Sequence, residues 1–478
     1  MINTKKNISI DNKAKDSSRL TLRLRIILAI VLIANTLDLM DSTITNIAAP
    51  SIVNDIGGGQ WLIKWLGASY ALAIGVLLVI GGRLGDKYGK RRMYLTGIAG
   101  FTIASAICGL SVNPTMIIAG RLIQGSFGAL LIPQGVSILM ATFSREQLPK
   151  AFSSFGPIMG LASISGPIAA GLIIDANIGG LHWRPMFLIN ISFGIVGFIA
   201  AFKVLPHDKA NSNEKLDVTG SILLGLMMFG LILGLIQGST NGWTTLPIIS
   251  IIGGAIMFIA FGFRQKYAAN PLIKLTLLSN KGFTSGLLME LGFFAALNGF
   301  VYVISLFFQL MLHFTPSKAS LGMAPTAIGI IISSLICKPL LSTLGRKLVA
   351  LGLLTTLVGT LGLFAIISIK GAAVSALMSA PAIFILGLGM GACISSIYDI
   401  AIGDVAQEET GSASGSLSAI QQLAAAIGSA VITTIFFNVL EKAGGVSAMT
   451  TCILVVAGII VLCFGLVGLL PQKSPAEK

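Results

Sequence analysis

The chain is a succession of long apolar runs, and this pattern limits its possible folds more than any other feature. A helix needs roughly 20 predominantly apolar residues to cross a bilayer. Fourteen such runs follow one another, at residues 25–49, 61–82, 93–111, 115–142, 150–174, 184–205, 217–238, 246–265, 282–312, 319–342, 347–369, 373–403, 411–440 and 446–470. The run at 319–342 is the weakest, because Pro325, Lys338 and Pro339 interrupt it. We therefore expect an all-α membrane protein with fourteen transmembrane helices.

Composition supports this interpretation and excludes several other classes. Of 478 residues, 54% are hydrophobic and only 10% are charged, too few charges to cover a soluble protein of this size. The five cysteines lie in apolar runs, and neither HExxH nor CxxC occurs, so we expect no metal site and no cofactor. No nucleophile–base pair or phosphate-binding loop indicates an enzyme.

The basic residues predict the orientation of the chain. The net charge of +14 comes from bases clustered between apolar runs, which argues against a nucleic-acid partner. If both termini are cytoplasmic, most of the 32 Lys and Arg residues fall on the cytoplasmic side, as the positive-inside pattern requires. We expect a multi-pass protein of the cytoplasmic membrane whose partner is the lipid bilayer, with both termini inside.

Among the charged side chains inside apolar runs, where an ionisable group is costly and usually functional, five are candidate site residues. They are Asp38, Asp41, Arg121, Glu290 and Asp399. Asp38 and Asp41 are three residues apart and can share one helix face. A buried carboxyl group is less costly when protonated, so such a site can exchange a proton for a cation. Alternatively, Asp38 only hydrates a cavity or hydrogen-bonds Asp41, Arg121 extends to the head groups, and Glu290 reaches bases at the membrane surface.

The segment "GGRLGDKYGKRRMYLTG" after the second run carries a recognisable motif. Gly82, Asp86, Gly89, Lys90 and Arg91 match the spacing G-x-L-x-D-x-x-G-[RK]-[RK]. We expect the glycines to allow a tight turn at the membrane face. The segment resembles the signature loop of the major facilitator superfamily, and "LSTLGRKLV" in the second half resembles a degraded copy without the acid. The resemblance implies two pseudo-symmetric six-helix halves and a loop that biases the conformational equilibrium.

Two further runs carry motifs that resemble the same family. In the fourth, Arg121, Gln124 and Gly125, followed by Gly128, resemble its R-x-x-Q-G pattern. The fifth reads "GPIMGLASISGPIAAG" and resembles the antiporter motif, which in this family marks exporters. The residues of that motif are Gly160, Gly166, Pro167 and Gly171. Packing of small residues is the alternative explanation for the glycines.

Three other stretches resemble the fourteen-helix drug:proton antiporter branch. "TITNIAAP" lies in the first run, "HWRPMFLINISFG" opens the sixth with a W-R-x-x-F-x-x-N pattern, and "GSASG" opens the thirteenth. The resemblance implies an N-terminal half at 25–206, an inserted pair of helices at 216–266 and a C-terminal half at 280–470. Cytoplasmic tails at 1–24 and 471–478 would complete the chain.

The expected function is proton-coupled export of amphipathic, cationic drugs or dyes by a monomer that uses alternating access. The resemblance also allows a dedicated exporter of one compound class, such as a tetracycline-like drug, a lipid or a metabolite. A membrane sensor on the same fold is the third alternative. The short tails disfavour it, since a sensor is expected to carry a soluble domain.

Overall fold

The computed structural model describes residues 21–144, 147–148, 151, 155–208, 217–268, 271–272, 275–403, 405 and 410–471. Within these ranges the regular structure is helical. The long helices are α2 (Leu22–Ile56), α3 (Gly59–Tyr88), α4 (Lys90–Gly109), α5 (Pro114–Thr142), α7 (Phe155–Ala176), α8 (Pro185–Val204), α9 (Val218–Asn241), α10 (Thr245–Tyr267), α12 (Lys281–Leu306), α13 (Pro316–Leu344), α14 (Arg346–Lys370), α15 (Ala376–Gly403) and α16 (Thr410–Leu466). A short helix, α11 (Leu275–Ser279), precedes α12, and a π-helical turn, Phe307–Met311, extends it.

The structure confirms fourteen membrane-crossing helices. Gly444 adopts φ 80°, ψ 172° inside α16, so this 57-residue element consists of two consecutive helices. Large apolar side chains on the outside of the bundle face the position of the lipid. On α10, for example, Ile252, Ile256 and Ile259 are each more than half exposed. The expected all-α membrane fold is confirmed.

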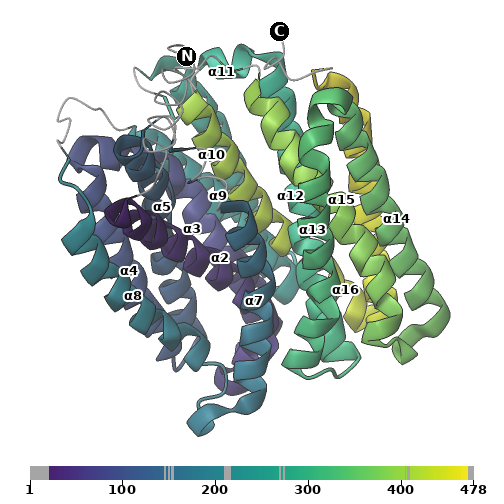
Figure 1. Ribbon diagram of the computed structural model, residues 1–478. Coiled ribbons are helices and arrows are strands. Elements are labelled where there is room, and N and C mark those ends of the chain that lie inside the picture. Colours follow the sequence, from purple (N-terminus) through teal and green to yellow (C-terminus); the bar gives the residue numbers. More distant parts are fainter. Residues whose placement is uncertain are drawn as a thin grey trace, which may run out of the picture.

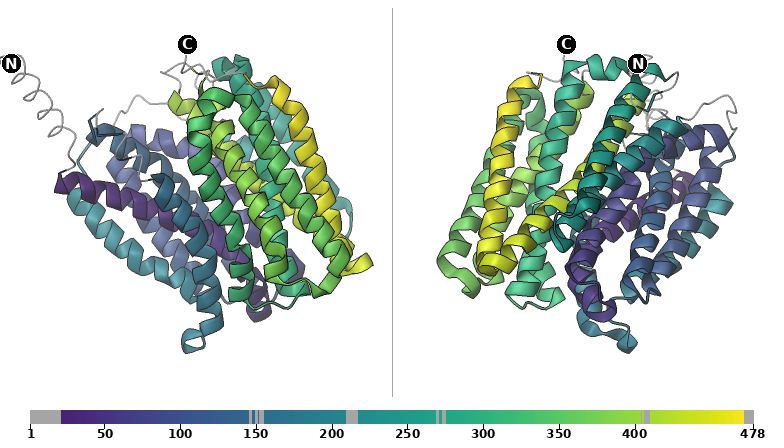
Figure 2. Two further views of the ribbon diagram at one scale, coloured as in Figure 1. Left: turned by 45° about the vertical axis from the view of Figure 1, so that its right-hand side comes forward. Right: turned by 180° about the vertical axis from the view of Figure 1, so that it is seen from behind.

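The helices form two groups with a pair beside them (Figures 1 and 2). Helices α2–α8 pack together, and helices α12–α16 form the second group. The groups meet where α3 packs against α16, where α7 packs against α13, and along α2 and α12. Helices α9 and α10 pack against each other at the back of Figure 1, and α9 also touches α3 and α16.

Polar caps define where several helices begin. Asn113 accepts a hydrogen bond from the amide of Met116 at 2.9 Å and opens α5, and Asn280 does the same for α12 through Phe283 at 3.0 Å. Asp217 caps α9 through Gly220 at 3.0 Å. Its carboxylate also pairs with Arg264 of α10 at 3.0 Å, which fixes the two helices of the pair to each other.

The order of the helices defines two faces of the molecule. We call the face where α2 begins and α16 ends the terminal face, and the opposite one the far face. Helix α3 reaches the terminal face and continues to Tyr88, so Gly82 and Asp86 of the family motif lie on a helix and not in a loop. The expected tight turn is confined to Gly89, whose φ of 96° suits glycine.

Close helix packing depends on glycine at the contacts. A Cβ atom on Gly428 of α16 would collide with the backbone oxygen of Ala295 of α12. The second helix of α16 offers a matched comparison, because a Cβ on Gly458 would meet no atom within 4 Å.

We predict that Gly428→Ala destabilises the protein, by about 1–3 kcal/mol or more, because two helix backbones must separate. The measurement is the apparent Tm of the purified protein in detergent. Gly458→Ala adds the same methyl group to the following helix of α16 and is expected to leave the Tm within one degree of wild type. Equal Tm values for the two variants would contradict the packing argument.

Candidate functional site

A buried ion pair joins the first and fourth crossings of the membrane. Asp41 of α2 and Arg121 of α5 are each only 1% exposed, and Nη1 of Arg121 donates to Oδ2 of Asp41. Nη2 of the same guanidinium donates to the backbone oxygen of Asp41 at 3.3 Å. Arg121 therefore does not extend to the head groups, and that alternative is wrong.

Three polar side chains complete the shell of this pair. Nδ2 of Asn190, on α8, donates to Oδ1 of Asp41 at 2.9 Å. Gln124 accepts from Arg121 at 2.8 Å and donates through Nε2 to Oγ of Ser105, on α4, at 2.8 Å. Four helices thus meet at one charge pair, and both carboxylate oxygens of Asp41 are hydrogen-bonded.

Aromatic rings cover the guanidinium. The Cζ atom of Arg121 lies 4.2 Å from the ring centroid of Tyr70 and 5.7 Å from that of Phe187. Such cation–π contacts stabilise a cation that has little water around it. The Nε atom of Arg121 is buried and has no hydrogen-bond partner among the described residues. The Nε of the guanidinium is therefore an unused donor inside the protein.

Asp38 has a different partner from the one expected. Its Oδ1 accepts from the hydroxyl of Tyr70 at 2.5 Å, and the side chain is 7% exposed. Tyr70 therefore touches both Asp38 and Arg121. The structure places two acids on the first crossing, one bound to a cation and one to a phenol.

The fourth-crossing motif is accounted for by these contacts. Arg121 and Gln124 supply the polar network. Gly125 lets α5 approach α3, since a Cβ there would lie 2.5 Å from the backbone oxygen of Tyr70. A Cβ on Gly128 would lie 2.8 Å from Oδ1 of Asp38. Both glycines therefore hold the helices close enough for the network to form.

The W-R-x-x-F-x-x-N stretch sets the position of Asn190. At the far face, Nε1 of Trp183 donates to Asp55 at 3.0 Å, and Nη1 of Arg184 donates to the same oxygen at 2.5 Å. This fixes the start of α8 to the end of α2. Phe187, one turn along, covers Arg121, and Asn190 then reaches Asp41. The motif was noted from the sequence, but Asn190 was not recognised as a site residue.

An apolar cavity borders the ion pair. Its volume is about 380 Å³, and it lies between α2, α7 and α8. Asp41 and Asn190 contribute polar groups to a wall that is otherwise formed by side chains such as Met40, Met186 and Phe193. A cavity of this size with few polar groups suits a small amphipathic molecule.

The residues of the antiporter motif lie on α7, between the two groups of helices. A Cβ on Gly166 would come within 2.9 Å of the Thr43 hydroxyl on α2, and one on Gly171 within 2.7 Å of the backbone oxygen of Pro316 on α13. Gly160 and Pro167 lie on the same helix. The small residues thus permit close contact of α7 with both groups.

The signature motif at the terminal face is held by a residue that sequence reasoning missed. The carboxylate of Asp208, after α8, accepts from the backbone amides of Lys90 and Arg91, the latter at 3.2 Å. It therefore caps α4, because Gly89 has no side chain to do so. Asp86 is exposed near the end of α3. Asp208 lies 117 residues from Arg91, so no local pattern indicates this contact.

The acids of the second group do not join this network. Glu290 of α12 is 2% exposed, and its Oε2 has no hydrogen-bond partner among the described residues. Asp399 is exposed, four residues before the end of α15. Each group of helices therefore contains at least one buried acid, Asp41 in the first and Glu290 in the second, whereas Asp399 is exposed. Among the described residues, no cluster of three or more His, Cys, Asp or Glu side chains could hold a metal ion.

A double-mutant cycle tests the ion pair. We predict that Arg121→Gln destabilises the protein by about 3–5 kcal/mol, because a buried carboxylate loses its counter-charge. Asp41→Asn should cost a similar amount, whereas the double variant should cost less than either single change. The measurement is chemical or thermal unfolding of purified protein. Strictly additive effects would show that the two side chains do not interact.

Comparison with known proteins identifies the family of the chain. The family model of the Major Facilitator Superfamily matches residues 31–429. A "Probable actinorhodin transporter" of Streptomyces coelicolor is 38% identical over 418 residues, which cover 86% of this chain and 72% of that protein. A puromycin resistance protein of Streptomyces alboniger is 27% identical, with coverages of 85% and 81%. The multidrug transporter protein MdtP of Bacillus subtilis is 29% identical, with coverages of 80% and 69%.

Solved structures support the fold. The crystal structure of a POT peptide transporter superposes with a TM-score of 0.68 at 16% identity, covering 95% of this chain and 97% of that one. The nucleoside transporter NupG gives a TM-score of 0.63 at 14% identity, with coverages of 94% and 100%. The fourteen helices, the motifs described above and the relatives named as antibiotic and multidrug transporters agree with the match to the family model. The chain therefore belongs to the Major Facilitator Superfamily, in its fourteen-helix branch of drug exporters.

Proposed function

We propose that this transporter exports amphipathic, cationic drugs from the cell in exchange for protons. The observation that carries the proposal is the buried pair of Asp41 and Arg121 beside an apolar cavity. A carboxylate at a cavity wall can hold either a proton or the charge of a cationic substrate. The names of the relatives support drug export in general, while the proton and the cationic cargo rest on the chemistry of this site.

In the proposed cycle, the protonation of Asp41 changes the partners of Arg121. A proton on Oδ2 neutralises the carboxylate, and the guanidinium is left with an uncompensated charge. Tyr70 and Asp38 lie on its other side, so Arg121 can turn toward a second acid. This step alters the contacts between α2 and α5 and couples the proton to helix movement.

The contacts between the two groups of helices indicate which face must open. Near the far face, Gln60 donates to Glu441 at 2.8 Å, Tyr302 donates to the backbone oxygen of Ile63 at 2.7 Å, and Ser317 donates to Asp175. If the basic terminal face is cytoplasmic, as the positive-inside pattern predicts, these bonds close the external side. Export then requires them to break, and the two halves to rock, once in each cycle.

Glu290 is the proposed second proton site. Its buried oxygen lacks a partner among the described residues, so the side chain is less costly when it carries a proton. Unlike Asp41, it forms no ion pair with a described residue, and it lies in the other half. One acid in each half would allow two protons to be exchanged for one substrate.

A dedicated exporter of one compound class is the second candidate function. Several relatives are named for a single antibiotic, such as actinorhodin and puromycin. A narrow substrate range would fit the same site, since the lining of the cavity and not the ion pair would then set specificity. Transport assays with several cargoes distinguish the two.

The first functional test is efflux of ethidium from cells that express the protein, with and without a protonophore. We predict that wild-type efflux requires the proton gradient and that Asp41→Asn lowers it at least tenfold, because the proton site is removed. Asn54→Ala changes an exposed polar side chain on the same helix and should retain at least half of the rate. Protonophore-sensitive efflux by Asp41→Asn would move coupling to Glu290, which Glu290→Gln then tests. A lack of efflux by well-expressed wild type would favour the single-compound exporter.

A cross-link across the far face tests alternating access. We predict that a disulfide between Asp175→Cys and Ser317→Cys abolishes transport, because the two residues join α7 to α13 and must separate. A reducing agent should restore activity, and each single variant should remain active under oxidation. The five native cysteines are buried and should not interfere. Full transport by the cross-linked protein would refute opening at this contact.

A further inference from the structure

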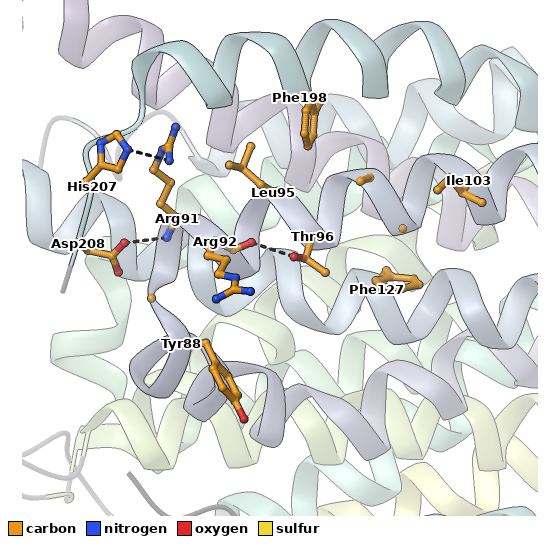
Figure 3. Close-up of a pocket in the computed structure, with 13 residues that line it drawn as sticks. Tyr88, Arg91, Arg92, Leu95, Thr96, Ile103, Phe127, Phe198, His207 and Asp208 are labelled. Atoms are coloured by element: carbon orange, nitrogen blue, oxygen red, sulfur yellow. Dashed lines mark hydrogen bonds between the residues drawn. The ribbon is translucent and has the colours of Figure 1, made fainter. Parts of the chain in front are cut away.

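A groove on the outside of the first group of helices has a chemistry that the transport proposal does not use. It runs along α4 between α5 and α8 and has a volume of about 660 Å³ (Figure 3). Polar residues gather at its terminal-face end, where Arg91, Arg92, His207 and Asp208 lie. Beyond them the lining becomes apolar and includes Leu95, Ala99, Ile103, Phe127 and Phe198.

The apolar part has the length of one lipid leaflet. Leu95, Ala99 and Ile103 are spaced four residues apart and so lie along one face of α4. From Arg92 to Ile103 the helix rises about 17 Å, while half of a bilayer's hydrocarbon core measures about 15 Å. Phe127 and Phe198 flank this face, and Ile103 is 62% exposed. An acyl chain that enters beside Arg92 would therefore end near Ile103.

The polar end has a surplus of positive charge. The only carboxylate among its lining residues, that of Asp208, is occupied by the backbone amides of Lys90 and Arg91. Arg91 binds His207 at 3.1 Å and the backbone oxygen of Phe202 at 2.6 Å, but its buried Nε has no hydrogen-bond partner among the described residues. The guanidinium of Arg92 is exposed, and no hydrogen bond or ion pair joins it to the described part of the chain. Arg92 thus retains accessible donors that a phosphate can use, and Arg91 adds a second positive charge beside it.

We propose that this groove binds a phospholipid with a net negative head group, such as phosphatidylglycerol. The phosphate lies at the exposed guanidinium of Arg92, with the charge of Arg91 nearby, and one acyl chain lies along Leu95, Ala99 and Ile103. Basic pockets between transmembrane helices at the membrane surface select anionic head groups in this way. Asp208 also lines this end of the groove, and its carboxylate repels a phosphate. Binding therefore requires the positive charge of Arg92. The inference does not depend on proton coupling or on the exported compound.

The test uses a phosphatidylglycerol and a phosphatidylcholine that carry the same photoreactive group at the end of one acyl chain. Each is incorporated at a low fraction into vesicles of unlabelled phosphatidylcholine that contain the full-length protein. After illumination, mass spectrometry quantifies the labelled peptides around Ile103. We predict that phosphatidylglycerol labels this segment about fivefold more than phosphatidylcholine, the factor expected for one favourable basic residue.

Three variants separate the head-group site from the acyl site. Arg92→Gln should lower phosphatidylglycerol labelling about fivefold, to the phosphatidylcholine level, because the charge is lost. Ala99→Phe should block the chain path and abolish labelling near Ile103 for both lipids. Lys347→Gln removes an exposed base at the start of α14, in the other half, and should change nothing.

Several results would overturn the proposal. Equal labelling by the two lipids would exclude a preference for anionic head groups. A preference that survives Arg92→Gln would place the head group elsewhere, and labelling near Ile103 that survives Ala99→Phe would exclude the acyl path. Inorganic phosphate at 10-fold molar excess over labelled lipid should not compete, since it lacks the chain. Competition would indicate a phosphate site instead of a lipid site.

Discussion

The charge pair of Asp41 and Arg121 constrains the arrangement of the whole first half. A buried carboxylate and a buried guanidinium each lose their water, and the loss is offset only if every remaining polar atom finds a partner at good geometry. Here α5 and α8 supply Arg121 and Asn190 to Asp41 on α2, and α4 supplies Ser105, which accepts from Gln124 and Asn190. A shift of one helix by a single turn would leave a charge unsatisfied in a low-dielectric medium. The pair thus specifies the mutual register of four helices.

Small residues make this register possible. Gly125 and Gly128 bring α5 against α3 and α2, and Gly166 brings α7 against α2. In lipid, helices gain little from hiding apolar surface from water, so close van der Waals contact and polar bonds have to hold them together. The glycine contacts and the charge network therefore depend on each other: the glycines bring the helices close, and the polar bonds hold them there. Gly171 likewise allows α7 to approach α13 closely, and in the proposed cycle the two halves move at this contact.

The sequence was sufficient for the fold because a membrane span leaves a strong local signal. Fourteen apolar runs gave fourteen helices, with most ends within a few residues. The site was predicted only in part. Asp41 and Arg121 stood out as charges in apolar runs, but they are 80 residues apart, and their pairing depends on how α2 and α5 pack. Asn190 and Tyr70 are ordinary residues in a helix, and only the W-R-x-x-F-x-x-N spacing pointed to the former. The exposure of Asp399 could not be predicted either, because it depends on how α15 packs, and the functional role of this residue stays a prediction.

The helix that begins after Gly89, α4, touches both the buried network and the outer groove. On one side, Asp208 fixes the start of α4 through the amides of Lys90 and Arg91; on the other, Arg91 and Arg92 form the polar end of the outer groove. Helix α4 also contributes Ser105 to the network around Asp41. A head group that binds Arg92 therefore acts on α4. About four turns away, Ser105 of the same helix is hydrogen-bonded to the network around Asp41 and Arg121. Rigid helices transmit such a displacement along their axis, since their backbone hydrogen bonds resist stretching. If lipid binds in the groove, its binding energy is thus applied to a helix that touches the network around Asp41 through Ser105 and Cys108.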